Sequence, residues 1–479
     1  MKRFIALICL IIAVASAQAE IKLPAIFGDN MLLQQNTEVN IWGWAEKGKR
    51  VEVTPSWSSK KHTAIADAKT GKWMLKVSTP MGGYDKYSLS ISENGKYELT
   101  INDILIGEVW LCSGQSNMEM PMKGFKNQPV EGGNIDILKS KNDAIRFISV
   151  KRSSQLTPQE NFTGQWEAAR PETVKEFSAT AYYFARLLQE MLDMPVGLIH
   201  SSWGGSWAEA WMSKEMLVDF PEINIPTKEE DVKEKNRTAT ALYNGMIHPI
   251  LGYTIKGAIW YQGESNYERA DQYLSLFPKL VSEWRKDWNI GDFPFYYCQI
   301  APYNYESIAP KENHGGKFNS AFLREAQYKA VDLIPNSGMA VLMDVGEDLC
   351  IHPRQKQIGG ERLAMLALGK TYGMTGFAFE SPTYKEMEID GSKVILTFNN
   401  APMWLTSFGK ELKNFEVAGE DKVFHPATAK IQRSKIEVTS SKVAKPVAVR
   451  YAFKDYVEAD LFSTEGLPVS SFRTDNWEE

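Results

Sequence analysis

Residues 107–122 read Gly-Glu-Val-Trp-Leu-Cys-Ser-Gly-Gln-Ser-Asn-Met-Glu-Met-Pro-Met, an apolar run that breaks at Gly114 and is followed at once by Ser116. The apolar part, 109–112, predicts a buried strand. A helix that begins after the turn would point its free N–H groups at whatever the serine hydroxyl attacks, which is how hydrolases present a nucleophile. The alternative is a serine that only caps the helix. The stretch is not the Gly-x-Ser-x-Gly elbow, because Met118 stands where the second glycine would be.

The composition bounds the domain count and the class of partner. With 479 residues, 43% of them hydrophobic, the chain can bury a large core and should form two or three domains. A formal net charge of -5 without a basic stripe argues against nucleic acid. The 14 Trp and 19 Tyr suit either a carbohydrate cleft or packing in β-rich domains. The cysteines show no zinc spacing; Cys112 and Cys298 are expected to be buried thiols, and a pairing of Cys112 with Cys350 stays open.

Residues 1–19 have the pattern of a secretion signal. Two positive residues precede an apolar run at 4–14, and Ala17-Gln18-Ala19 is a small-residue cleavage site. No later stretch of the sequence reaches membrane-spanning length. We therefore expect an exported protein, periplasmic or extracellular once the signal is removed.

The rest of the chain reads as three regions. Residues 20–105 carry short alternating runs between turns, which predict a β-sandwich. Residues 106–375 alternate buried-strand runs with helical stretches, which predict a parallel sheet with helices on both faces. Residues 376–479 read as β again, either a third domain or the completion of the first sandwich. The charged segment 228–237 is expected to be a solvated helix or loop and not a site.

Within the middle region, strands are expected at 196–199, 255–261, 295–300 and 339–343, and helices at 179–192, 271–287, 324–333 and 354–372. Ligands in such folds bind at the carboxyl ends of the strands. Four short segments fall at the expected strand ends or just before a helix: 114–118, 201–206, 260–266 and 351–354. Glycines there let backbone N–H groups approach a ligand, and a serine, a later histidine and several donors are the parts of an acyl-transfer site. Each segment also has a plain interpretation as a loop, a hydrogen-bonded turn or, for Glu264, a buried structural acid.

Several motifs occur in order over most of the chain. They are Leu23-Pro24, 29–34, Trp42-Gly43-Trp44, 107–118, 243–247, 256–266, Ile351-His352-Pro353 and 360–364. In this combination the chain resembles the sialate O-acetylesterase family, a carbohydrate-esterase branch of the SGNH hydrolases. The resemblance implies a flavodoxin-like parallel sheet of the SGNH type. It also implies a serine esterase that removes O-acetyl groups from sugars, above all sialic acid, through an acyl-enzyme and without a metal or organic cofactor.

The resemblance also implies roles for individual residues. Ser116 matches the nucleophile and His352 the general base. The backbone N–H of Ser116 and that of Gly204 or Gly205 would hold the oxyanion. The side chain of Gln262 would add a third donor to the oxyanion hole.

The remaining roles concern support and orientation. Glu264 and Asn266 match the block that shapes the pocket. SGNH enzymes carry Asp-x-x-His, but position 349 here is Leu, so Asp348 is the expected orienting acid. Glu347, Asp344 or a backbone carbonyl are the alternatives, the last of which would leave a Ser-His dyad.

Two other functions stay open at this stage. One is an acetylesterase that acts on xylan or another polysaccharide. The other is a secreted carbohydrate-binding protein whose hydrolase core is inactive, which the missing acid and the many aromatic residues motivate. The expected partner is an O-acetylated sugar or glycan, with no nucleic acid and no membrane insertion, and the sequence leaves the oligomeric state open.

Overall fold

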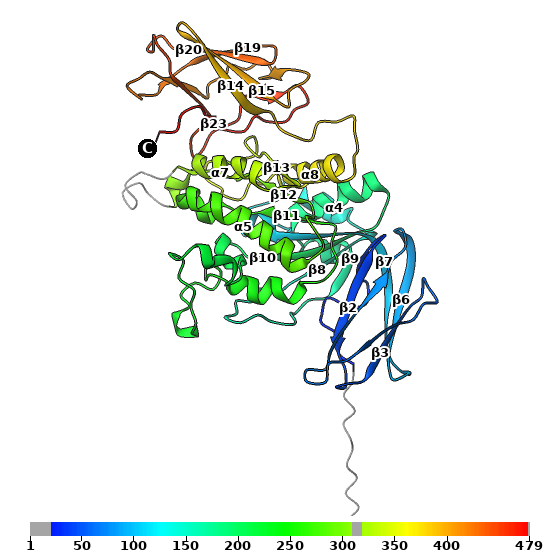
Figure 1. Ribbon diagram of the computed structural model, residues 1–479. Coiled ribbons are helices and arrows are strands. Elements are labelled where there is room, and N and C mark those ends of the chain that lie inside the picture. Colours follow the sequence, from blue (N-terminus) through cyan, green and yellow to red (C-terminus); the bar gives the residue numbers. More distant parts are fainter. Residues whose placement is uncertain (1–20, 309–318, 478–479) are drawn as a thin grey trace, which may run out of the picture.

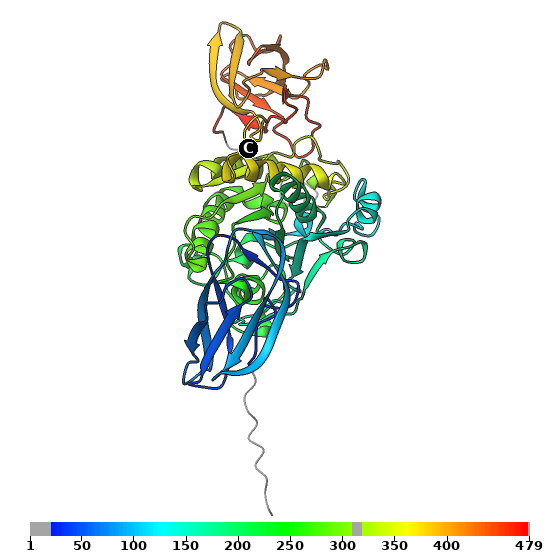
Figure 2. The ribbon, with the colours of Figure 1, turned by 90° about the vertical axis from the view of Figure 1, so that its right-hand side faces the viewer.

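The structure, a computed structural model, describes residues 21–308 and 319–477. The secretion signal expected at 1–19 lies outside these residues. Two β-rich regions lie on opposite sides of a central α/β region (Figures 1 and 2). Among the described residues, no helix combines the length and apolar character needed to cross a membrane.

One long strand, β7 (Lys96–Gly114), belongs to both the N-terminal β region and the central sheet. It pairs antiparallel with β6 (Gly83–Glu93) and parallel with β1 (Leu32–Gln34) before it enters the centre. Its last residues pair in parallel with β10 (Val196–Ser202) on one side and β11 (Gly257–Tyr261) on the other. The domain boundary expected at residue 105 therefore falls inside a continuous strand.

The central sheet has the order β13-β12-β11-β7-β10-β8-β9. The strands not yet described are β8 (Asn142–Ser149), β9 (Trp166–Ala169), β12 (Phe295–Cys298) and β13 (Ser337–Ala340). All neighbours are parallel except β9, which runs antiparallel to β8. Because β7 is first in the chain and central in the sheet, connections leave it in both directions. Such a point is where open α/β sheets bind ligands.

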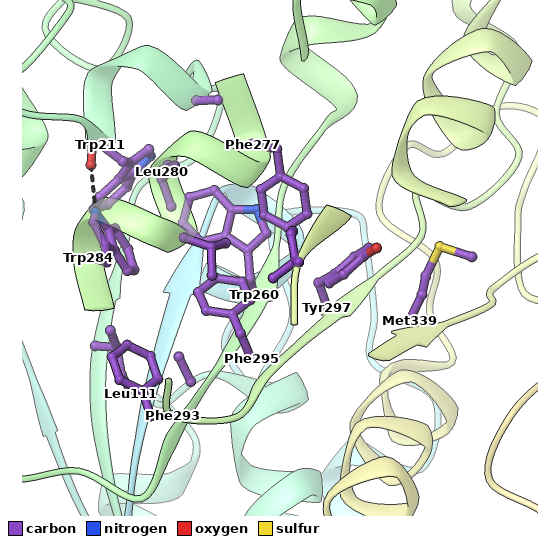
Figure 3. Packing of buried hydrophobic residues seen from close by; sticks show 14 of the residues in the cluster. Leu111, Trp211, Trp260, Phe277, Leu280, Trp284, Phe293, Phe295, Tyr297 and Met339 are labelled. Carbon is purple, nitrogen blue, oxygen red and sulfur yellow. Dashed lines mark hydrogen bonds between the residues drawn. The ribbon is translucent and has the colours of Figure 1, made fainter. Parts of the chain in front are cut away.

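Helices cover both faces of this sheet. They are α4 (Ala179–Leu192), α5 (Ala270–Trp288), α7 (Ser320–Leu333) and α8 (Lys356–Leu366), the last continued by the π-helical segment η8 (Ala367–Thr371). Successive strand residues alternate between two cores: Leu111 packs with α5 and α7, whereas Trp110 and Cys112 pack with α4 and α8. Figure 3 shows the first core, in which Trp284 Nε1 donates to the Trp211 carbonyl at 3.0 Å. The predicted sheet with helices on both faces is confirmed, and it is parallel except for the edge strand β9.

The predicted elements mostly coincide with the observed ones. The four expected helices match α4, α5, α7 and α8 with its π-helical extension. The strand expected at 339–343 is displaced, because β13 ends at Ala340 and residues 341–343 are buried outside the sheet. Burial alone makes such an apolar run look like a strand.

The flanking regions are β-rich. In the N-terminal region β2 (Glu38–Trp44) pairs with β5 (Lys72–Ser78), and β3 (Arg50–Pro55) pairs with β4 (His62–Ile65) and with β6. The C-terminal strands are β14 (Thr383–Asp390), β15 (Lys393–Asn399), β16 (Leu405–Thr406), β17 (Phe415–Ala418), β18 (His425–Pro426), β19 (Thr428–Gln432), β20 (Lys435–Thr439), β21 (Ala448–Tyr451), β22 (Phe462–Ser463) and β23 (Phe472–Arg473). They pair only with one another, so they do not complete the first sandwich.

The cysteines outside the expected signal are free thiols. Cys112 and Cys298 are buried as expected, and burial raises the pKa of both thiols. Cys350 is half-buried, and its Sγ donates to the His352 carbonyl at 3.3 Å. The pairing of Cys112 with Cys350 that the sequence left open is not formed.

Candidate active site

The carboxyl end of β7 turns sharply into a four-residue helix, α1 (Ser116–Glu119). Gly114 has a φ of 136° and lies opposite Tyr261, whose carbonyl oxygen would be 2.2 Å from a Cβ added there. Only glycine fits this turn. Gln115 is the N-cap, so the interpretation of Ser116 as an ordinary capping residue is wrong. Ser116 is instead the first helical residue, half-buried at the end of the central strand.

The loop after β10 lies directly against Ser116. A Cβ added to Gly204 would lie 3.3 Å from the Cβ of Ser116. The Gly204 N–H donates to Glu119 Oε2 at 2.8 Å, so this N–H already has an acceptor. Among the described residues no hydrogen bond uses the N–H of Gly205. Of the two glycines between which the sequence could not choose, Gly205 is therefore the one whose backbone N–H is available to bind an oxyanion.

His352 is held by a turn that the sequence did not single out. Its Nδ1 lies 2.7 Å from Gln128 Oε1, and the Phe125 ring packs edge-on against the imidazole with centroids 5.2 Å apart. Because an amide oxygen only accepts, Nδ1 carries the proton and Nε2 is left as the basic nitrogen. Burial, followed by the positive charge of Lys356, lowers the pKa of His352 to about 4. The imidazole is therefore neutral at pH 7, as a general base must be.

The carboxylates expected near His352 have other partners. Asp344 binds Arg362 through two hydrogen bonds of 2.6 Å. Glu347 accepts from the Arg354 N–H at 2.8 Å, and the Asp348 side chain is exposed. None of the described hydrogen bonds joins these three acids to His352, whose Nδ1 is occupied by Gln128. The role of Asp348 stays a prediction.

A buried polar network ties the serine and histidine segments together. Asn117 Nδ2 donates to Glu264 Oε1 at 2.5 Å and to the Ile351 carbonyl at 3.1 Å. Lys356 Nζ donates to Asn117 Oδ1. Burial raises the pKa of Glu264 and lowers the pKa of Lys356 to about 8. The residue after Ser116 is thus bonded to the residue before His352, and Glu264 lies in contact with that link.

Gln262 and Asn266 form a second buried network. Gln262 Nε2 donates to the Ser206 carbonyl at 3.1 Å and to Asn266 Oδ1 at 2.7 Å. Asn266 Nδ2 donates to Glu209 Oε2 at 3.0 Å. Both amide hydrogens of Gln262 are occupied, so an oxyanion would have to displace one of these acceptors. The role of Gln262 as a donor stays a prediction.

The charged segment 228–237 reaches the site, contrary to expectation. Asn236 Nδ2 donates to the Gly204 carbonyl at 2.8 Å, and Arg237 Nε donates to the Gly205 carbonyl at 3.2 Å. Charge density in the sequence indicates solvation, but the last residues of such a segment can still bind a neighbouring loop. The part of the chain that the structure describes contains no cluster of three His, Cys, Asp or Glu side chains able to hold a metal ion.

The fold and the site together are those of an ester hydrolase built on a parallel α/β sheet. Residues 106–361 match the family described as carbohydrate esterase, sialic acid-specific acetylesterase, and the chain belongs to this family. The protein is thus a carboxylic ester hydrolase.

Relatives along most of the chain agree with this assignment. The sialate O-acetylesterases of Pongo abelii and Homo sapiens are each 30% identical over 424 residues, which cover 80% of this chain and 77% of theirs. That of Mus musculus is 29% identical and covers 81% of both chains. A solved carbohydrate acetylesterase from Xanthomonas citri is 34% identical, with a TM-score of 0.85, 95% of this chain covered and 100% of that one.

Proposed function

We propose that the protein removes O-acetyl groups from sialic acids through a serine acyl-enzyme. The observation that carries this proposal is the 3.1 Å hydrogen bond from Asn117 to the Ile351 carbonyl. It joins the neighbour of Ser116 to the neighbour of His352, although the two segments are far apart in the sequence. The names of the relatives supply the substrate class, and the neutral imidazole supplies a base for the serine.

In the proposed mechanism His352 Nε2 takes the proton of Ser116 as Oγ attacks the acetyl carbonyl. The N–H groups of Ser116 and Gly205 hold the developing oxyanion, each worth about 3 kcal/mol of barrier. The sugar hydroxyl leaves with the proton from His352. Water, activated by the same imidazole, then attacks the acetyl-serine and releases acetate.

The proposal includes a core of the SGNH type and an exported mature protein. The central place of β7, with Ser116 at its carboxyl end, supports the first. The secretion-signal pattern of residues 1–19 supports the second.

The test is the variant Ser116→Ala, assayed for acetate release from 9-O-acetyl-N-acetylneuraminic acid and for hydrolysis of p-nitrophenyl acetate. We expect both activities to fall by at least about a thousandfold, because removal of the nucleophile leaves only positioning and oxyanion stabilisation. The matched control is Ser113→Ala on the same strand, whose buried Oγ has no hydrogen-bond partner among the described residues.

Two results would overturn the proposal. A folded Ser116→Ala protein with undiminished activity would remove Ser116 as the nucleophile. Much faster acetate release from acetylated xylan than from the sialic acid would overturn the substrate. A fluorophosphonate that labels the wild type but not Ser116→Ala would exclude the alternative of a binding protein with an inactive hydrolase core.

A further inference from the structure

Guanidinium groups lie over indole rings on both sides of the Gly204-Gly205 loop. The Arg152 Cζ lies 5.5 Å from the ring centre of Trp203. Trp207, on the other side, lies beneath Arg237 at 5.4 Å and Arg269 at 4.7 Å. Both indoles are half-buried. The loop that touches Ser116 thus carries an aromatic and cationic rim.

Arg152 is the cation most directly tied to the nucleophile. Its Nε and Nη2 donate to the two oxygens of Glu119, each at 2.6 Å. Glu119 lies one turn after Ser116 and also accepts the Gly204 N–H at 2.8 Å. Arg152 is thus linked to the loop against Ser116 through Glu119 as well as through Trp203.

Arg152 also keeps donors for a ligand. Its side chain is 53% exposed, whereas that of Glu119 is 14% exposed. Among the described residues no hydrogen bond uses Nη1 of Arg152. Arg237 and Arg269 are less exposed, at 39% and 33%, and both use Nη1 in ion pairs with Glu234 and Glu209. Nη2 of Arg269 has no hydrogen-bond partner among the described residues, but it is buried. Arg152 is therefore the best placed of the three to bind an anion.

We infer that Arg152 binds the carboxylate of an acidic sugar, so that the enzyme selects anionic over neutral acetylated substrates. The inference deepens the proposed function and rests on it. A guanidinium has five donors in a fixed plane, so it can hold Glu119 along one edge and a second carboxylate along another. Because Glu119 and Trp203 already fix the side chain, little rotamer freedom is lost when a ligand binds.

This contact acts differently on acidic and on neutral substrates. A charge-assisted hydrogen bond to a carboxylate lowers KM for an acidic sugar by about tenfold to a hundredfold. A neutral sugar with the same acetyl ester gains nothing from Nη1. The alternative is that Arg152 only holds Glu119 in place, in which case its loss would slow every ester alike.

The first experiment compares 9-O-acetyl-N-acetylneuraminic acid with its C1 carboxamide, which has the same ester and no charge. We expect the wild type to prefer the acid by at least about tenfold in kcat/KM, and Arg152→Gln to lose this preference through a raised KM. Turnover of p-nitrophenyl acetate by the same variant measures any loss that all esters share, because Arg152 also holds Glu119. The controls are Arg152→Lys, which keeps the charge, and Lys151→Gln, which removes an exposed charge from the neighbouring position.

The second experiment measures binding of free N-acetylneuraminic acid by calorimetry in the Ser116→Ala background. We expect Arg152→Gln to weaken this binding by about tenfold or more. Equal wild-type rates on the acid and the carboxamide, or equal sialate affinity with and without Arg152, would overturn the inference. A wild type without esterase activity that still binds sialate through Arg152 would overturn the proposed function alone.

Discussion

At the scale of single residues, an amide rather than a carboxylate holds the imidazole of His352. In a Ser-His-Asp triad the acid fixes the tautomer and stabilises the imidazolium that forms during the reaction. Gln128 can do the first but not the second. Lys356, the charged group that acts on the ring, opposes protonation. His352 therefore stays neutral down to low pH. The imidazolium that forms during the reaction is less stabilised than it would be beside the acid of a triad.

The variant Gln128→Glu tests this account. A carboxylate 2.7 Å from Nδ1 favours imidazolium, so it raises the pKa of His352 from about 4. Activity requires the neutral base and is lost as pH falls through this pKa. We expect the acid limb of kcat/KM to lie near pH 4 in the wild type and to move upward by one pH unit or more in the variant.

The turn offers matched comparisons for this shift. Asn127→Asp adds the same charge at the exposed neighbouring residue and should move the limb only slightly. Gln128→Ala adds no charge, so kcat/KM should fall by about tenfold or more while the limb stays in place. An acid limb that is the same in all four proteins would show that Gln128 does not act on His352.

At the scale of elements, hydrophobic periodicity was sufficient to predict the strands and helices that build the site. Buried runs and amphipathic stretches are local properties, so α4 could be predicted at its observed bounds and β10 over its first four residues. The partners of the catalytic residues come from loops and helix ends distant in sequence. Gln128, Arg152 and Lys356 have no periodic pattern or motif, and only the topology of the sheet brings them to the serine and histidine.

The turn between β7 and α1 is the element whose geometry the nucleophile depends on most. Gly114→Ala forces a Cβ to within 2.2 Å of the Tyr261 carbonyl at a φ of 136°. We expect a loss of about 2–5 kcal/mol in the free energy of unfolding, measured in urea, together with a large loss of kcat. Gly28→Ala, which meets no atom within 4 Å, should cost less than about 0.5 kcal/mol. Equal stability of the two variants would show that the strand end tolerates a side chain.

At the scale of the whole molecule, the two β regions are attached to the centre in different ways. The N-terminal region shares the continuous strand β7 with the central sheet, so it cannot separate without breaking that strand. Among the described residues the C-terminal region shares no strand with the centre, and it is held by side chains and by the backbone hydrogen bond from the Tyr303 N–H to the Asp455 carbonyl at 3.1 Å. Arg324 of α7 is fully buried in this contact. It donates to the carbonyls of Lys454 and Asp455 and, at 3.2 Å, to Ser471 Oγ.

The variant Arg324→Met should therefore loosen the C-terminal region selectively. Burial lowers the pKa of Arg324 to about 10, so the guanidinium stays charged at pH 7. Its loss removes the donors to the Lys454 carbonyl and to Ser471 Oγ, whereas the Asp455 carbonyl keeps the Tyr303 N–H. We expect a cost of about 3–5 kcal/mol in urea unfolding and faster proteolysis in the 373–382 connection, with p-nitrophenyl acetate hydrolysis retained. Lys329→Met, which removes a 51% exposed cation from the same helix, should change the stability by less than about 1 kcal/mol. If both variants unfold and are cleaved like the wild type, contacts other than Arg324 hold the C-terminal region in place.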